Sequence, residues 1–160
     1  MVKRWAIFDL DNTIADINNR LAIASKSGKL DYNKLHSEDL IRQDEPMYET
    51  IDLINDLANF NVGIFILTGR FESTLAVTKE WLMFHNVPYD KIVMKSYKDT
   101  YVKSNTWKEK QLQKFIEENN ITFEHIILAA DDYKQNQTMF ESWGIPCLDP
   151  LYKLNTIASR

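Results

Sequence analysis

The sequence predicts an α/β protein, a three-layer α/β/α sandwich around a central, mostly parallel sheet of five strands. Short apolar runs bounded by polar turn formers recur along the chain, and each is typical of a strand buried on both faces. Segments with apolar residues at helical spacing alternate with these runs. The alternation indicates parallel strands joined by right-handed helical crossovers, which cover both faces of the sheet.

The size and composition fit one folded domain over residues 1–160. A hydrophobic content of 44% argues against disorder, and 160 residues suffice to bury a core. The net charge of −4 gives no general basic surface, so a nucleic-acid substrate would need a local patch. The single cysteine, Cys147, excludes an internal disulfide and suits a reducing compartment. Since no apolar run is long enough to cross a membrane, we expect a cytoplasmic protein.

The expected elements follow one another with a single insertion. Residues 14–45 are polar and weakly periodic, which predicts a small cap or flap of turns and short helix over the end of the first strand. Glu45 and Pro46 then predict the opening of a helix, because proline suits a first turn. We expect strands near 5–8, 62–67, 91–94, 125–129 and 145–148, helices near 45–59, 72–85, 107–119 and 139–143, and a tail after Pro150.

Two aspartates stand at the end of the first expected strand. The apolar run stops at Asp9, and Asp11 follows two positions later, so on an extended backbone both side chains share a face. The carboxyl edge of an open parallel sheet is where ligands bind. Two carboxylates there suit a divalent cation, or a nucleophile with an acid/base partner, although a turn or a cap can show the same pattern.

Further candidate site residues follow later strands or lie on the helix between them. They are Thr68, Gly69 and Arg70 after the second strand, Lys108 on a helix, and Asp131 and Asp132 after the fourth strand. Each has a simpler interpretation when taken alone: a strand-to-helix turn, a solvated lysine and a helix cap. The fold would nevertheless bring these strand ends into one crevice.

In this order the segments resemble the motifs of the haloacid dehalogenase (HAD) superfamily. The four matches are DLDNT after a strand, TGR after a strand, a helical lysine, and DD after a strand, over residues 4–132. The resemblance implies a HAD-like, Rossmann-like fold and hydrolysis of phosphomonoesters through an aspartyl-phosphate. Asp9 would attack phosphorus, and Asp11 would protonate the leaving oxygen and then activate water.

The same resemblance implies roles for the remaining motif residues. Thr68 would hydrogen-bond the transferring phosphoryl group, and Lys108 would neutralise the charge of the nucleophile and the phosphate. A magnesium ion would be held by the Asp9 carboxylate, the Asp11 backbone carbonyl and Asp131, with Asp132 beside it. A few carboxylates and several waters are the ligands that Mg²⁺ prefers.

Within the superfamily the chain resembles the 3′-phosphatase domain of phage polynucleotide kinase/phosphatase. Arg20 lies nine positions beyond Asp11, and the stretch Leu-Thr-Gly-Arg ends at Arg70. In that family the arginines at the positions of Arg20 and Arg70 assist phosphate and substrate binding, and Gly69 belongs to the same motif. A guanidinium group can donate two parallel hydrogen bonds to the oxygens of a phosphate. In this chain Arg20 could also be a solvated residue of a polar insertion.

Two departures from the phage family stand out. Asn12 occupies a position where that family has glycine, and the acidic residue expected shortly before Lys108 is replaced by Ser104 or Asn105. Other superfamily phosphatases tolerate the first departure, and the second concerns the substrate contacts rather than the core chemistry. No G-x-x-x-x-G-K-[ST] motif occurs in the sequence, so we expect only the phosphatase half of such an enzyme.

Three functions from two classes remain open. The first is a magnesium-dependent phosphomonoesterase acting on a polynucleotide 3′-phosphate end or a nucleotide, and the second is a small-metabolite or 5′-nucleotide phosphatase of the same superfamily. The third is a catalytically inactive phosphate-binding module, which the intact motif set disfavours. The expected partner is a phosphorylated nucleotide or nucleic-acid end, with neither a membrane nor an obligate protein partner. A basic and aromatic rim for such a substrate, or a solvated loop, is formed by Lys95, Tyr97, Lys98, Tyr101 and Lys103.

Overall fold

A computed structural model of the protein describes residues 1–151. Its central sheet has five strands in the order β5-β4-β1-β6-β7, and every neighbouring pair is parallel. The strands are β1 (Trp5–Phe8), β4 (Gly63–Phe71), β5 (Lys91–Lys95), β6 (Ile126–Ala130) and β7 (Cys147–Leu148). The predicted tail after Pro150 lies outside the described residues except for Leu151.

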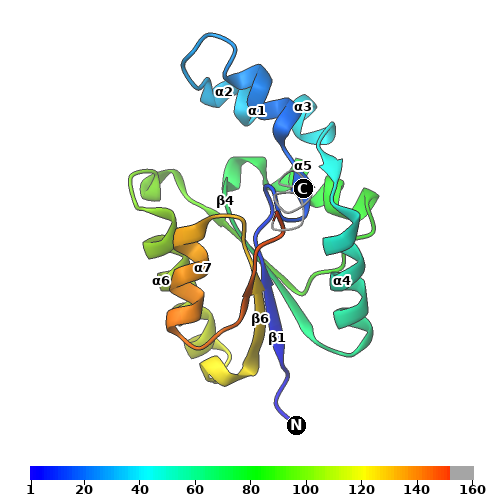
Figure 1. Cartoon of the computed structure of the whole chain (residues 1–160), viewed down its shortest axis with the longest axis vertical. Helices are drawn as coiled ribbons and strands as arrows, with labels where there is room; N and C mark the ends of the chain where they lie inside the picture. The colour runs from blue at the N-terminus through cyan, green and yellow to red at the C-terminus, as the bar shows by residue number, and fades with distance from the viewer. Residues whose placement is uncertain (152–160) are drawn as a thin grey trace, which may run out of the picture.

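Helices cover both faces of the sheet, which confirms the predicted three-layer sandwich (Figure 1). Alternate residues of the central strand point to opposite sides: Phe8 joins one core cluster and Ile7 the other. The helices are α4 (Tyr48–Asn59) and α5 (Leu75–Phe84) on the Phe8 side, and α6 (Ser104–Glu118) and α7 (Lys134–Ser142) on the Ile7 side. Short 3₁₀ turns are η1 (Glu72–Thr74), η2 (Tyr97–Asp99) and η3 (Phe123–His125).

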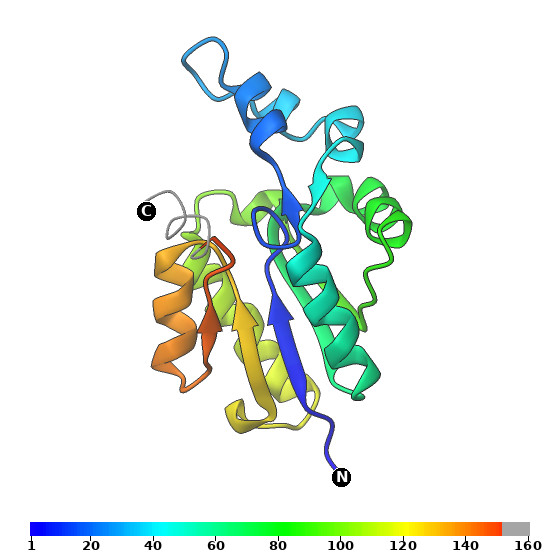
Figure 2. The same ribbon diagram turned by 45° about the vertical axis from the view of Figure 1, so that its right-hand side comes forward.

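The insertion after β1 stands above the carboxyl ends of the strands (Figure 2). Its elements are β2 (Ala15–Asp16), α1 (Asn18–Ala24), α2 (Tyr32–Leu35), α3 (Glu38–Arg42) and β3 (Glu45–Pro46). The prediction that Glu45 and Pro46 open a helix is wrong. They pair with Asp16 and Ala15 in an antiparallel ribbon, and α4 begins only at Tyr48. A two-stranded ribbon consists of edge strands, which tolerate the missing N–H of proline.

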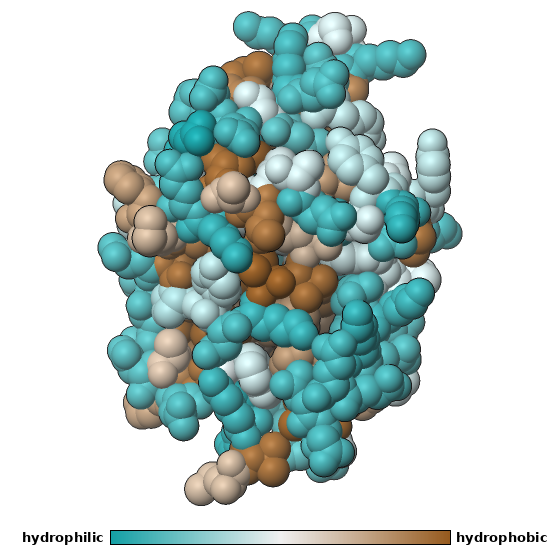
Figure 3. Space-filling model, turned by 180° about the vertical axis from the view of Figure 1, so that it is seen from behind, coloured by the Kyte–Doolittle hydropathy of each residue, from teal (hydrophilic) through white to brown (hydrophobic). Residues whose placement is uncertain are grey.

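The start of β4 is fitted closely to β1. Gly63 pairs with Trp5, and a Cβ atom at Gly63 would clash with the Trp5 ring. Only glycine allows this approach. On the outer surface, hydrophobic residues gather near the middle of the face seen from behind (Figure 3).

Candidate active site

The loop after β1 presents the two aspartates at the centre of the sheet edge. Asp9 directly follows the strand, and its backbone N–H donates to the Ala130 carbonyl of β6 at 2.9 Å. The chain then turns through Asn12, which has a φ of 57°. Glycine and asparagine are favoured in this left-handed region. The departure from glycine at position 12 therefore preserves the conformation of the turn.

On one side of the site, Lys108 joins Asp9 to Asp131. Its ammonium Nζ lies 3.0 Å from Asp9 Oδ1 and 2.7 Å from Asp131 Oδ2. Lys108 is only 2% exposed, so the interpretation as a solvated lysine is wrong. Asp131 is oriented by the side-chain amide of Asn136 and by the backbone N–H of Tyr133, at 3.1 and 3.0 Å. These contacts bring the ends of β1 and β6 together with α6, as the sequence predicted.

The carboxylates on this side form an anionic cluster that fits a divalent cation. Oxygen atoms of Asp9, Asp131 and Asp132 lie within 4.8 Å of one another. Burial raises the pKa of Asp9 well above its ordinary value, and although Lys108 opposes this shift, the charges of Asp131 and Asp132 add to it. Burial, together with Asp131, also raises the pKa of Asp132. One lysine does not balance three carboxylates, and their hard oxygen atoms suit Mg²⁺.

On the other side of the site, Asp11 is held by two arginines. Its Oδ1 atom accepts from Arg20 Nη2 at 3.0 Å and from Arg70 Nε at 2.7 Å. Burial alone would raise the pKa of Asp11, but the charges and hydrogen bonds of Arg70 and Arg20 outweigh it and lower the pKa below its ordinary value. The interpretation of Arg20 as a solvated residue is wrong, because the side chain is 1% exposed.

Asp44 is the counter-ion of both arginines, and sequence reasoning missed it. Arg20 donates to both Asp44 oxygens, at 3.0 and 2.9 Å, and Arg70 donates to Oδ2 at 2.9 Å. The indole N–H of Trp81 on α5 donates to the Asp44 carbonyl at 3.0 Å. Arg20 and Asp44 come from the insertion, whereas Arg70 and Trp81 come from the core. This buried network therefore fastens the insertion to the sheet.

Thr68, Gly69 and Arg70 lie in an irregular part of β4. Thr68 pairs with Met94, and Phe71 pairs with the next residue of β5, so two intervening residues bulge out of the ladder. The bulge turns Arg70 toward Asp11, while the Oγ1 atom of buried Thr68 accepts the backbone N–H of Arg70 at 3.1 Å. Gly69 is exposed. The bulge thus directs the Thr68 and Arg70 side chains toward the carboxyl edge of the sheet.

The predicted residues share one pocket of about 300 Å³. From the core and the turn after β1 it is lined by Asp9, Asp11, Thr68, Gly69, Arg70, Lys108 and Asp132, and from the insertion by Tyr32, Leu35 and His36. Asp131 and Arg20 lie behind this lining and act on it through Lys108 and Asp11. Ser104, which stands where an acidic residue was expected, also lines the pocket and accepts from Asn136 Nδ2 at 3.1 Å.

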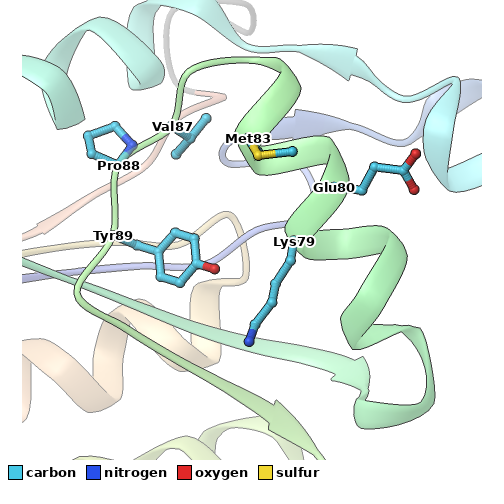
Figure 4. Close-up of a pocket in the computed structure, with 6 residues that line it drawn as sticks. All are labelled: Lys79, Glu80, Met83, Val87, Pro88 and Tyr89. Atoms are coloured by element: carbon cyan, nitrogen blue, oxygen red, sulfur yellow. The ribbon is translucent and has the colours of Figure 1, made fainter.

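A second, larger hollow of about 600 Å³ lies beside α5 and contains none of these residues (Figure 4). It is lined by Lys79, Glu80, Met83, Val87, Pro88 and Tyr89. Within residues 1–151, its only charged groups are Lys79 and Glu80, and it lacks the convergent carboxylates of the first pocket. The chemistry is therefore concentrated at the carboxyl edge of the sheet.

The sequence matches the family model of the polynucleotide kinase PNKP phosphatase domain over residues 3–150. The chain belongs to this family of HAD phosphatases. It is accordingly a phosphoric monoester hydrolase of the HAD type, which confirms the resemblance seen in the four motifs. A search of curated protein sequences found no match.

Solved structures share the fold at low sequence identity. A chain of a Pnkp1/Rnl/Hen1 RNA repair complex has a TM-score of 0.71 at 19% identity, over 92% of this chain and 42% of that one. A predicted phosphatase from Clostridium acetobutylicum has a TM-score of 0.68 at 13% identity, over 92% and 84% of the two chains. A phosphoserine phosphatase, solved as a phospho-aspartyl intermediate analogue, has a TM-score of 0.63 at 17% identity, over 93% and 94%.

The phosphatase fold thus spans less than half of the chain from the RNA repair complex. Among residues 1–151, no helix combines the length and the apolar character that a membrane span requires.

Proposed function

We propose that this phosphatase is a magnesium-dependent enzyme that removes the phosphate from a polynucleotide 3′ end, or from a nucleotide, through an aspartyl-phosphate on Asp9. The observation that carries this proposal is that two carboxylates in one pocket have surroundings of opposite charge. Asp9 faces Lys108 and an acidic cluster, whereas Asp11 is paired with two arginines. Environments that separate two neighbouring carboxylates in this way are typical of a division of catalytic roles.

The metal would be held by Asp9, Asp131 and Asp132, with the Asp11 backbone carbonyl as a further ligand. When bound, Mg²⁺ supplies positive charge that offsets the repulsion between the Asp9 carboxylate and the phosphate. The geometry supports this assignment because the three carboxylates converge without enough positive charge of their own. Asn136 and Lys108 hold Asp131 in place for this role.

In the first step, an Asp9 oxygen attacks phosphorus and the bond from phosphorus to the leaving oxygen breaks. Lys108, 3.0 Å from Asp9 Oδ1, keeps the carboxylate oriented and offsets negative charge during attack. Thr68 lies at the pocket wall, where its hydroxyl can hydrogen-bond the transferring phosphoryl group. The leaving oxygen takes a proton from Asp11, as the superfamily resemblance implies.

In the second step, Asp11 takes a proton from water, and the resulting hydroxide attacks phosphorus. The bond from phosphorus to the Asp9 oxygen breaks, which releases inorganic phosphate and regenerates the Asp9 carboxylate. The lowered pKa keeps Asp11 ionised in the free protein, which suits this role as a base. A phosphate near Arg70 and Arg20 would share their positive charge and raise the pKa of Asp11, so that Asp11 takes up from solvent the proton that it donates in the first step. We assign substrate binding to the two arginines in this indirect sense, and to Gly69 as an exposed part of the pocket wall.

The family match supports a nucleic-acid end as substrate, since its description names a polynucleotide kinase phosphatase domain. The neighbour from an RNA repair complex points the same way. We propose that residues 14–45 are a small cap of a single domain, because α2 and the residue after it line only one wall of the pocket. The intact arrangement of Asp9, Asp11 and Lys108 argues against an inactive phosphate-binding module.

The test is phosphate release, with magnesium, from a matched set of substrates. The set contains a 3′-phosphorylated oligonucleotide, its 5′-phosphorylated twin, and 3′- and 5′-mononucleotides. We expect the 3′-phosphorylated strand to have the highest kcat/KM. Preference for 5′-mononucleotides would assign the enzyme to small substrates instead, and lack of release from every substrate would contradict the proposed reaction.

A further inference from the structure

Four aromatic rings form a continuous ladder from the insertion to the core. Tyr32 and His36 are stacked with ring centres 6.4 Å apart, and His36 meets Phe71 edge-on at 4.9 Å. Phe71 stacks on Tyr97 at 4.6 Å with an angle of 3° between the ring planes. Such contacts are within the range at which aromatic rings attract one another. The ladder therefore joins α2 to the end of β4 and to η2.

This aromatic ladder, Tyr32, His36, Phe71 and Tyr97, borders the catalytic pocket. Its first three members line the pocket together with Asp9 and Asp11. Burying large aromatic rings normally contributes to stability, yet the two ends of the ladder stay in contact with solvent: Tyr32 is 61% exposed and Tyr97 is 65% exposed. Aromatic surface is thus accessible beside the pocket that holds Asp9 and Asp11.

The surroundings of the ladder distinguish it from a phosphate-binding patch. Burial and the charge of Arg20 lower the pKa of His36, so its ring is neutral near pH 7. Lys95 pairs with Phe71 in the sheet and lines the same pocket. A row of neutral rings beside the cations of the pocket, among them Lys95 and Arg70, matches a nucleotide, which presents a flat base and a backbone phosphate.

We propose that the aromatic ladder is a stacking site for an unpaired base next to the scissile phosphate. The proposal rests on the proposed phosphatase function and extends it by assigning the residues that recognise the substrate. Stacking tolerates every base because each has a flat π face, so the site selects a nucleic-acid strand rather than a sequence.

The experiment compares two 3′-phosphorylated oligonucleotides that differ only in whether the last two nucleosides carry bases. For wild-type protein we expect kcat/KM to be about 10-fold higher with the bases present, which corresponds to roughly 1.4 kcal/mol of stacking. Tyr97→Ala should bring this ratio close to one, whereas Tyr97→Trp should keep it. Tyr32→Ala tests the other end of the ladder in the same way.

Tyr48→Ala is the matched control. Tyr48 is 68% exposed, close to the exposure of Tyr97, and it neither lines the pocket nor makes a ring contact within residues 1–151, so its removal should leave the ratio unchanged. The proposal is overturned if wild-type protein treats both oligonucleotides alike, or if Tyr97→Ala keeps the preference.

Fluorescence anisotropy of the two labelled oligonucleotides separates this proposal from the phosphatase reaction. If no substrate is hydrolysed but the oligonucleotide with bases still binds more tightly, the proposed reaction fails and the stacking site stands. If the substrates are hydrolysed but both oligonucleotides bind equally well, the proposed reaction stands and the stacking site is overturned.

Discussion

Asp9 and Asp11 stand two residues apart on one loop, yet their surroundings have opposite charge. Asp9 meets one lysine and two further carboxylates, and burial with these carboxylates raises its pKa. Asp11 accepts from two buried arginines, whose charge lowers its pKa despite burial. The difference arises from position in the fold, because Asp9 faces the end of β6 and Asp11 faces the insertion.

The two sides of the pocket differ in their balance of charge. The Asp9 side has an excess of negative charge, which a cation would complete. The Asp11 side is already balanced, because two guanidinium groups are matched by Asp11 and Asp44. Substitutions on the two sides should therefore differ in their effects on activity and on stability.

The largest effect on activity is expected from Asp9→Asn, which removes the proposed nucleophile. Phosphate release should fall by roughly four orders of magnitude or more. In metal-free buffer the same variant should have a higher Tm than wild type, because the folded protein disfavours the charge of Asp9. Because the pKa of Asp9 is raised in the folded protein, the free energy of unfolding of wild type falls as the pH increases from the ordinary value of 3.8 toward the raised pKa. The variant lacks this pH-dependent loss of stability. A variant with normal turnover would contradict the assignment.

Asp11→Asn should lower turnover of natural phosphomonoesters by roughly 10² to 10⁴-fold, the usual range for losing a general acid or base. Binding of inorganic phosphate, measured by calorimetry, should remain, because Arg20, Arg70 and Lys108 are unchanged. Unlike Asp9→Asn, this variant should not gain stability, since it removes the partner of two buried arginines. An increase in Tm would show that the Asp11 side is not balanced as described.

Asp44→Ala tests the buried counter-ion on the Asp11 side. Removing one member of a buried ionic network costs about 3–5 kcal/mol of unfolding free energy, because the other charges lose their partner. Urea unfolding measures this loss. Asp39→Ala is the control from the same insertion, since the Asp39 side chain is 89% exposed and its removal should cost less than about 0.5 kcal/mol. If the two variants are equally stable, the buried ionic network does not fasten the insertion to the core.

The smallest effect on stability is expected from the cation, although its removal should stop turnover. EDTA should abolish turnover and magnesium should restore it. At about 100 times its Kd, magnesium should stabilise wild-type protein by about 2.7 kcal/mol, which raises Tm by several degrees. Asp131→Asn should reduce this shift, whereas Tyr101→Ala should not. Turnover in EDTA would contradict the metal site on the Asp9 side.

Much of the fold followed from the sequence because apolar runs and helical spacing report burial directly. The strands end where the sequence predicted, to within a few residues, except that β4 continues through Arg70 as a bulged strand. The helix expected at Glu45 failed because local preference for proline at a helix start lost to pairing with Ala15 and Asp16. Such a ribbon depends on a contact across the whole insertion, which no local pattern reports.

The Asp9 side of the site was predictable, and the network on the Asp11 side was not. Asp9, Thr68 and Asp131 belong to adjacent parallel strands, so their convergence follows from topology alone. Asp44 lies at the end of a polar stretch, where an acidic residue indicates a solvated surface. Its role appears only when Arg20 and Arg70, distant in sequence, both donate to it. The motif match indicated that the arginines matter, but not that they donate to Asp11.

A burst experiment with Asp11→Asn protein tests the division of roles most directly. p-Nitrophenolate is a good leaving group that needs no proton, so the first step should proceed without Asp11, while hydrolysis of the aspartyl-phosphate should be slow. We predict a burst of one p-nitrophenolate per protein molecule and, by mass spectrometry, a phosphorylated peptide containing Asp9. The absence of both in Asp11→Asn protein, or their presence in Asp9→Asn protein, would contradict the proposed mechanism.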